Sequence, residues 1–253
     1  MPLLATVLLL AGLAACSPAV TPGAGALNGP TAVVTSVVPG VHPLMVAPRA
    51  TTRVLSIKID YQDHALSCEA AALKMALAYE GIRIDELTLI GYMTDDLRAA
   101  TFDAQGRLVA WGDPARAYVG NPDGHIERYT GYGVYNAPVA RAAIRAGAQV
   151  VRSGSGLYGK GIPPSAVYNS VLAGHPVVVW ISNTYHDVPL HRYTAYDGAK
   201  VWYTLTEHAV TVIGVRPGGV LINDPWFGQA WHSKAQFESA YRTFGNMAVV
   251  IGR

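Results

Sequence analysis

The sequence predicts an α+β fold, and three observations carry that prediction. Segments with helical periodicity and helix-capping residues gather in the first part of the domain, before residue 175. Apolar, β-branched segments separated by short turns follow from residue 177 onward. The two kinds of element hardly alternate, which favours helices packed on an antiparallel sheet over a parallel α/β arrangement.

The first expected element is a strand at residues 55–59, whose apolar residues alternate with polar ones. A helix follows at residues 67–79, with Ser67 as its N-cap, and a second helix begins after the cap residue Asp85. Residues 101–136 are rich in Gly, Asp, Asn and aromatic residues, so we expect an ordered loop over a groove rather than a core element. Their aromatic side chains suit either a substrate groove or anchorage of this loop.

The later elements are predicted from glycine stops and β-branched runs. Two helices that end at glycines are expected at residues 138–146 and 164–173. Five strands are expected at 177–181, 201–205, 208–215, 220–223 and 248–251, and one short helix at 234–241. A cleft between the helical half and the sheet half is expected to bring Cys68 opposite His208 and Asp224.

The N-terminal segment is typical of a bacterial lipoprotein. Residues 1–15 contain an apolar stretch too short to span a bilayer, and residues 13–16 read Leu-Ala-Ala-Cys, a small-residue cleavage site before a cysteine. We expect removal of residues 1–15 and diacylation of Cys16. Residues 16–52 are rich in Pro, Gly and Ala, which predicts a flexible tether before a folded domain at 53–253. A secretory signal with an incidental cysteine is the alternative.

Composition and charge narrow the possible partners. The formal net charge is +2 and only 14% of residues are charged, without a basic cluster, so nucleic acid is not an expected partner. The signal and lipid site instead predict an extracytoplasmic protein anchored to a bacterial membrane, in the periplasm or on the cell surface. Once Cys16 is acylated, Cys68 has no cysteine within the chain to pair with.

Cys68 is the candidate nucleophile. It would lie in the first turn of the helix at 67–79, where the helix N-terminus favours a thiolate. His208 opens a strand 140 residues later, a spacing typical of thiol hydrolases, and its imidazolium would favour the thiolate further. We therefore expect a thiolate and a protonated His208 at rest. Taken singly, a core cysteine and a polar strand-start histidine are the simpler interpretations.

Two further residues complete the candidate site. Asp224 ends the strand that follows His208, where its carboxylate can hydrogen-bond the far ring nitrogen and fix the tautomer. Gln62 precedes Cys68 by six residues and can aim its amide at a carbonyl oxygen under attack, forming an oxyanion hole with the Cys68 N–H. The joint order and spacing favour hydrolysis through an acyl-enzyme, without metal or cofactor.

Four segments carry a resemblance to a known family. Residues 67–73, 131–135, 207–210 and 223–226 resemble the bacterial peptidase family thirty-nine-like proteins. That group belongs to the papain-like clan and is related to peptidases that remove double-glycine leaders from bacteriocin precursors. The resemblance implies a papain-like fold acting on a peptide or protein, with Cys68 as nucleophile, His208 as base, Asp224 as orienting residue and Gln62 as oxyanion donor.

The match also leaves alternatives open. Glu69 stands where leader peptidases usually carry glycine, as in the secreted branch of the family, so double-glycine specificity is not expected to carry over. The same residues suit transglutaminase-like acyl transfer when an amine outcompetes water. They also suit a peptide-binding module without turnover. Competition by added amines and the reactivity of Cys68 distinguish these cases.

Overall fold

Five α-helices are present in the computed structural model, which describes residues 51–253: α1 (Cys68–Tyr79), α2 (Glu86–Met93), α3 (Asn136–Arg145), α4 (Pro164–Ala173) and α5 (Lys234–Arg242). The strands are β1 (Arg53–Val54), β2 (Asp95–Asp96), β3 (Thr101–Phe102), β4 (Leu108–Trp111), β5 (Tyr118–Gly120), β6 (Gly131–Gly133), β7 (Gln149–Gly154), β8 (Val177–Ser182), β9 (His191–Ala195), β10 (Lys200–Tyr203), β11 (Glu207–Arg216), β12 (Gly219–Asp224), β13 (Gly228–Ser233) and β14 (Ala248–Gly252). The predicted signal peptide, Cys16 and nearly all of the tether lie outside the described residues.

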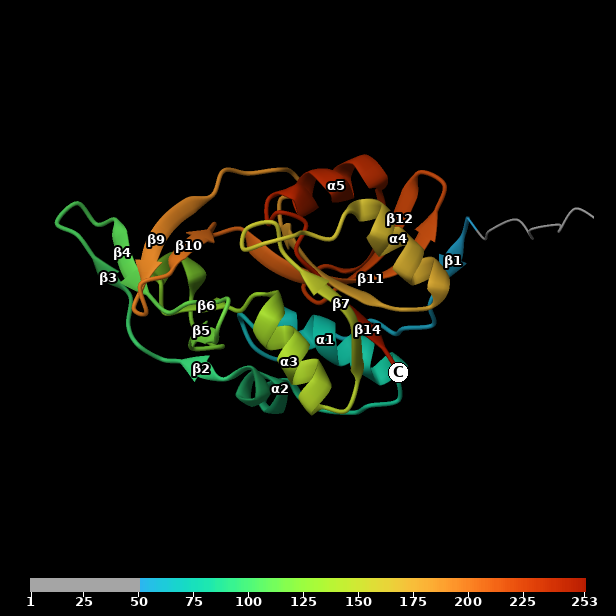
Figure 1. Cartoon of the computed structure of the whole chain (residues 1–253), viewed down its shortest axis with the longest axis horizontal. Coiled ribbons are helices and arrows are strands. Elements are labelled where there is room, and N and C mark those ends of the chain that lie inside the picture. Colours follow the sequence, from blue (N-terminus) through green and yellow to red (C-terminus); the bar gives the residue numbers. More distant parts are fainter. Residues whose placement is uncertain (1–50) are drawn as a thin grey trace, which may run out of the picture. The chain divides into compact units, whose positions relative to one another are not determined.

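A seven-stranded sheet forms the centre, in the order β13-β12-β11-β8-β14-β7, with β1 paired to β11. Helices α1 and α3 cover one face, and α4 and α5 cover the other (Figure 1). Alternation along β8 shows why both faces are buried: Val178 and Trp180 pack toward α1, whereas Val179 and Ile181 pack on the opposite side. The α+β fold class is confirmed.

Local capping signals placed most helix ends correctly. The Asp85 side chain accepts a hydrogen bond from the Thr88 N–H at 2.9 Å and begins α2, as expected. Gly174 has a left-handed conformation, φ +107°, and ends α4. Ser67 is the N-cap residue of α1, but its side chain does not bond a helix N–H. Its hydroxyl instead donates to the carboxylate of Glu86.

The expectation of a loop at residues 101–136 is wrong. This region contributes β3, β4, β5 and β6, and β4 pairs in parallel with β9 to form a second sheet ordered β10-β9-β4-β3. Its aromatic residues are largely core: Trp111, Tyr118, Tyr132 and Tyr135 are buried. Anchorage is therefore their main role, although Tyr132 also lines the cavity described below. The short strands escaped notice because two to four residues carry too little alternation to detect.

Several strand predictions also needed correction. A strand was expected at 55–59, but the paired residues are Arg53–Val54, just before that range. Within the range, the Leu55 N–H donates one hydrogen bond to the Ile213 carbonyl. Strands β7, β9 and β13 were missed, because they are polar and largely exposed. Their backbone groups are paired with strands distant in sequence or across a turn, which no local pattern reports.

Candidate active site

Cys68 begins α1 and lies against strand β11. Its side chain is 6% exposed, and its Sγ accepts a hydrogen bond from the Ala209 N–H at 3.4 Å. The Thr211 hydroxyl donates to the Ala72 carbonyl at 2.8 Å and fixes the same helix to the same strand. The first turn of α1 is thus held against the residue that follows His208, although Cys68 and His208 are far apart in the sequence.

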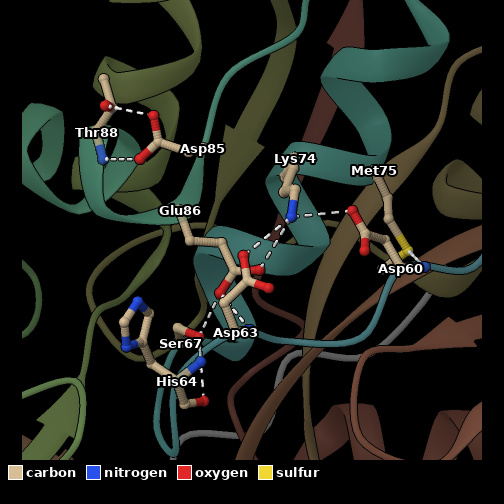
Figure 2. A network of polar contacts seen from close by, with 9 residues as sticks. All are labelled: Asp60, Asp63, His64, Ser67, Lys74, Met75, Asp85, Glu86 and Thr88. Carbon is tan, nitrogen blue, oxygen red and sulfur yellow. Dashed lines mark hydrogen bonds and ion pairs between the residues drawn. The ribbon is translucent and has the colours of Figure 1, made fainter.

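The segment that leads into Cys68 is tied down by a polar network around Glu86 (Figure 2). This buried carboxylate accepts hydrogen bonds from the Asp63 N–H at 3.0 Å and from the Ser67 hydroxyl. Lys74 of α1 lies 3.0 Å from Asp60, 3.2 Å from Asp63 and 3.5 Å from Glu86. Because a buried acid needs such partners, the network gives segment 60–67 one preferred path.

His208 and Asp224 form a direct pair. His208 is in β11, where it lies opposite Ile181 of β8. Asp224 ends β12, the other antiparallel neighbour of β11. The His208 Nε2 and Asp224 Oδ1 are 2.8 Å apart, and both side chains are buried. This leaves Nδ1 as the ring nitrogen that is not engaged by Asp224.

Asp224 is itself held in place by other donors. Its Oδ1 accepts from the backbone N–H groups of Trp226 and Phe227, at 2.8 and 3.0 Å, and its Oδ2 accepts from the Tyr185 hydroxyl at 3.0 Å. Burial alone would raise the pKa of Asp224, but the hydrogen bond and charge of His208, with these two N–H groups, hold that pKa below its ordinary value. Asp224 therefore stays ionised beside the imidazole.

Trp226 and Phe227 cover this pair from the solvent side. Their rings stack on each other, and their centroids lie 6.0 and 6.3 Å from that of His208. Both aromatic side chains are exposed on their outer side. Sequence reasoning did not assign a role to Trp226, Phe227 or Tyr185, because each acts only through its position around Asp224.

Gln62 lines the same cavity as Cys68, but its amide is already engaged. Its Nε2 donates to the carbonyl oxygens of His64 and Ala65, at 2.7 and 2.9 Å. Its Oε1 is buried without a hydrogen-bond partner among the described residues. An incoming carbonyl oxygen would have to replace one of these two acceptors, so the oxyanion role of Gln62 stays a prediction.

A cavity of about 200 Å³ joins these groups. Its lining includes Cys68, His208 and Gln62, together with Ala65, Leu66, Gly124, His125, Ile126, Glu127, Tyr132, Asn183, Leu205, Glu207 and Trp226. The cavity thus opens beside both the thiol and the imidazole. A concave site with apolar walls and a few convergent polar groups is typical of a ligand-binding site.

The electrostatic surroundings of Cys68 differ from the expectation. Burial raises the pKa of the Cys68 thiol, the nearby carboxyl groups of Glu69 and Glu207 raise it further, and the Ala209 N–H lowers it only in part. The resting thiolate expected from the helix N-terminus is therefore not favoured in this arrangement. If Cys68 is to act as a nucleophile, its proton must pass to a base as it attacks.

Glu69 and Glu207 are the components that sequence reasoning missed. Glu69 is fully buried. Its carboxylate accepts hydrogen bonds from the Val134 N–H at 2.5 Å and from the Cys68 thiol at 3.4 Å. Burial raises the pKa of Glu69 to about 7 and that of Glu207 well above its ordinary range, in part through Glu69. The signal was present: each acid directly neighbours a candidate catalytic residue within an apolar segment.

The comparisons agree with this architecture. A family model described as the Peptidase_C39 like family matches residues 54–249. Uncharacterized protein YvpB of Bacillus subtilis (strain 168) is 31% identical over 188 residues, which span 73% of this chain and 68% of that protein.

One solved structure agrees with this fold, and a second is given for comparison. A putative C39-like peptidase from Bacillus anthracis superposes with a TM-score of 0.63 at 27% identity, covering 81% of this chain and 98% of its own. The peptidase domain of Streptococcus ComA, a bi-functional ABC transporter, is more distant, with 13% identity, a TM-score of 0.44, and coverage of 78% and 98%. From the extent of the family match and the identity to YvpB, the chain belongs to the Peptidase_C39 like family.

Proposed function

We propose that this chain is a cysteine peptidase that cleaves peptide bonds with Cys68 as nucleophile, His208 as base and Asp224 as orienting residue. The observation that carries the proposal is the 2.8 Å pair between His208 and Asp224 at a cavity that Cys68 also lines. Family membership supports peptidase chemistry at the coarser level.

The reaction would follow from the atoms at hand. Cys68 Sγ attacks the peptide carbonyl carbon while its proton passes to Nδ1 of His208, the ring nitrogen that Asp224 does not hold. The resulting imidazolium is stabilised by the ionised Asp224. The C–N bond then breaks, the leaving amine takes the proton, and water hydrolyses the thioester. The free N–H groups of the first turn of α1 can receive the oxyanion.

The location is part of the same proposal. The lipoprotein signal at residues 1–15 and the acyl acceptor Cys16 support anchorage to a bacterial membrane, with the peptidase domain outside the cytoplasm. Among the described residues, no helix is long and apolar enough to cross a bilayer. Because the proposed anchor would hold the domain outside the cytoplasm, the proposed substrate is a peptide or protein in that compartment.

The test is hydrolysis of a mixed peptide library by the full chain and by Cys68→Ser, with products identified by mass spectrometry. The change is nearly isosteric, so the variant should fold while cleavage falls by orders of magnitude, because a hydroxyl is a poorer nucleophile beside imidazole. Full cleavage by Cys68→Ser would refute the mechanism.

Two further outcomes separate the alternatives. Added amines that divert most acyl groups from water into new amides would identify acyl transfer. Peptide binding without cleavage of any library member would identify a binding module. Because burial raises the pKa of Cys68, slow alkylation of the folded protein by iodoacetamide is expected in either case.

A further inference from the structure

Three buried side chains converge beside the cavity from two different elements. Cys68 and Glu69 come from α1, and Glu207 begins β11. The Cys68 Sγ and one carboxylate oxygen from each glutamate all lie within 4.8 Å of one another. Each of the three residues is more than nine-tenths buried. Among residues 51–253 this is the one such group of potential metal ligands.

The hydrogen bonds around the group leave room for a ligand. Glu69 accepts the Val134 N–H with Oε1, and its Oε2 lies 3.4 Å from Cys68 Sγ. Glu207 Oε1 is buried and, within the described part of the chain, has no hydrogen-bond partner. An unpaired buried carboxylate oxygen costs free energy of folding. A cation that binds this oxygen would remove that cost, which favours binding.

We propose that Cys68, Glu69 and Glu207 bind Zn²⁺, and that zinc held there blocks the nucleophile. The inhibitory part rests on the proposed peptidase function, whereas the binding part does not. Zinc accepts both thiolate and carboxylate ligands, at about 2.3 Å to sulfur and 2.0–2.2 Å to oxygen. Two ligands of one tetrahedral ion therefore lie roughly 3–4 Å apart, so small side-chain rotations suffice to close the observed group.

The donor set also selects the ion. A thiolate disfavours Mg²⁺ and Ca²⁺, which prefer oxygen ligands, and the thiolate together with one carboxylate balances a divalent charge. Zinc binding releases the thiol proton to solvent, because the thiolate is the form that binds the metal. Cys68 and Glu207 line the cavity, which provides an entry path and space for a water molecule as the fourth ligand.

The direct test uses the purified full chain, stripped of metal by a chelator and titrated with Co²⁺ and Zn²⁺. Co²⁺ bound to Cys68 should give a thiolate charge-transfer absorption that one equivalent of Zn²⁺ removes, and Mg²⁺ or Ca²⁺ should not. A competing chromophoric chelator then measures the Zn²⁺ dissociation constant. No charge-transfer band in the folded protein would overturn the proposal.

Variants assign the ligands. Glu207→Gln keeps the shape of the side chain but removes its charge, and should weaken Zn²⁺ binding by at least about 100-fold, since even outer-shell partners of metal ligands are worth 10- to 100-fold. Glu127→Gln is the matched control, because Glu127 lines the same cavity but lies outside the group. It should bind Zn²⁺ as the wild type does. Circular dichroism checks that each variant is folded.

His208→Ala separates this site from a simple cysteine–histidine chelate. The proposal expects His208→Ala to retain the cobalt band and most of the zinc affinity. Loss of binding in His208→Ala, with binding intact in Glu207→Gln, would overturn it. The cobalt band needs no turnover, so a protein without peptidase activity still tests the metal site. Conversely, if the protein is an active peptidase that neither binds Zn²⁺ nor is inhibited by it, the zinc site is refuted and the proposed peptidase function stands.

Discussion

At the scale of single residues, Asp224 is the acceptor on which the orientation of His208 depends. Its Oδ1 is 2.8 Å from His208 Nε2, and its Oδ2 accepts from the Tyr185 hydroxyl at 3.0 Å. The hydroxyl of Tyr185 can accept as well as donate, so an asparagine fits with its NH₂ toward Tyr185 and its oxygen toward His208. The hydrogen bond then survives and only the charge is lost.

We expect Asp224→Asn to lower kcat/KM by about 100-fold, less than the ~10⁴-fold loss in a serine protease whose variant holds the wrong tautomer. Asp224→Ala removes the acceptor and should cost clearly more. The measurement is kcat/KM for both variants on one peptide, after circular dichroism shows that each is folded. Equal losses would mean that His208 does not depend on this hydrogen bond.

Glu69 gives the residue-scale prediction for pH. Burial raises its pKa to about 7, against about 4.3 for an unfolded glutamate. Between these values the folded state keeps a proton that the unfolded state has released, so the free energy of unfolding falls as pH rises. The fall is on the order of 3 kcal/mol by pH 7 and then levels off.

Urea unfolding of the wild type and Glu69→Gln between about pH 4 and pH 8 measures this effect. The amide oxygen of the variant can still accept from Val134, so its stability should vary less with pH. Glu127→Gln, at an exposed glutamate, should keep the wild-type slope. An unchanged slope in Glu69→Gln would show that Glu69 ionises in the folded protein as it does in the unfolded chain.

At the scale of elements, the contact between β6 and the start of α1 sets the position of Glu69. Gly133 has φ +119°, a conformation that favours glycine, and a Cβ there would collide with Glu69 Oε1. The strand can therefore approach the helix only because residue 133 has no side chain. This close approach is what allows the Val134 N–H to reach the carboxylate.

Gly133→Ala should lower the free energy of unfolding by about 3 kcal/mol, from backbone strain and overpacking together. Gly106→Ala is the matched control: Gly106 also has a positive φ, +73°, but nothing lies within 4 Å of a Cβ there. It should lose only about 1–2 kcal/mol, the cost of the left-handed conformation. Similar losses in urea unfolding of the two variants would mean that Glu69 moves aside at little cost.

At the scale of the whole molecule, the proposed anchor determines where the peptidase meets its substrate. Cys16→Ala should abolish diacylation and removal of residues 1–15 by the lipoprotein pathway, because that pathway acts on the cysteine thiol. Mass spectrometry of the N-terminus and membrane fractionation measure both effects. Recovery of acylated, normally processed protein from Cys16→Ala would refute the anchor, whereas Cys68→Ser should be processed like the wild type.

The sequence alone determined the fold class, most helices and the apolar strands β8, β11, β12 and β14 of the central sheet, because these depend on local periodicity and caps. Residues such as Asp85 and Gly174 act within one turn of their own position, so their effect is visible in the sequence. The order of Cys68, His208 and Asp224 also identified a candidate site. Their side chains line or border one cavity because α1 packs on β11 and β11 pairs with β12.

Tertiary structure decided what local patterns do not contain. Strands β4 and β9 are separated by about 80 residues, yet their pairing turns an expected loop into a second sheet. Glu69 and Glu207 become neighbours only when α1 meets β11, and their burial beside the thiol then opposes the thiolate that the helix N-terminus favours. Burial and charge act through space, so the protonation state of Cys68 is a property of the packed structure rather than of the residues around it in the chain.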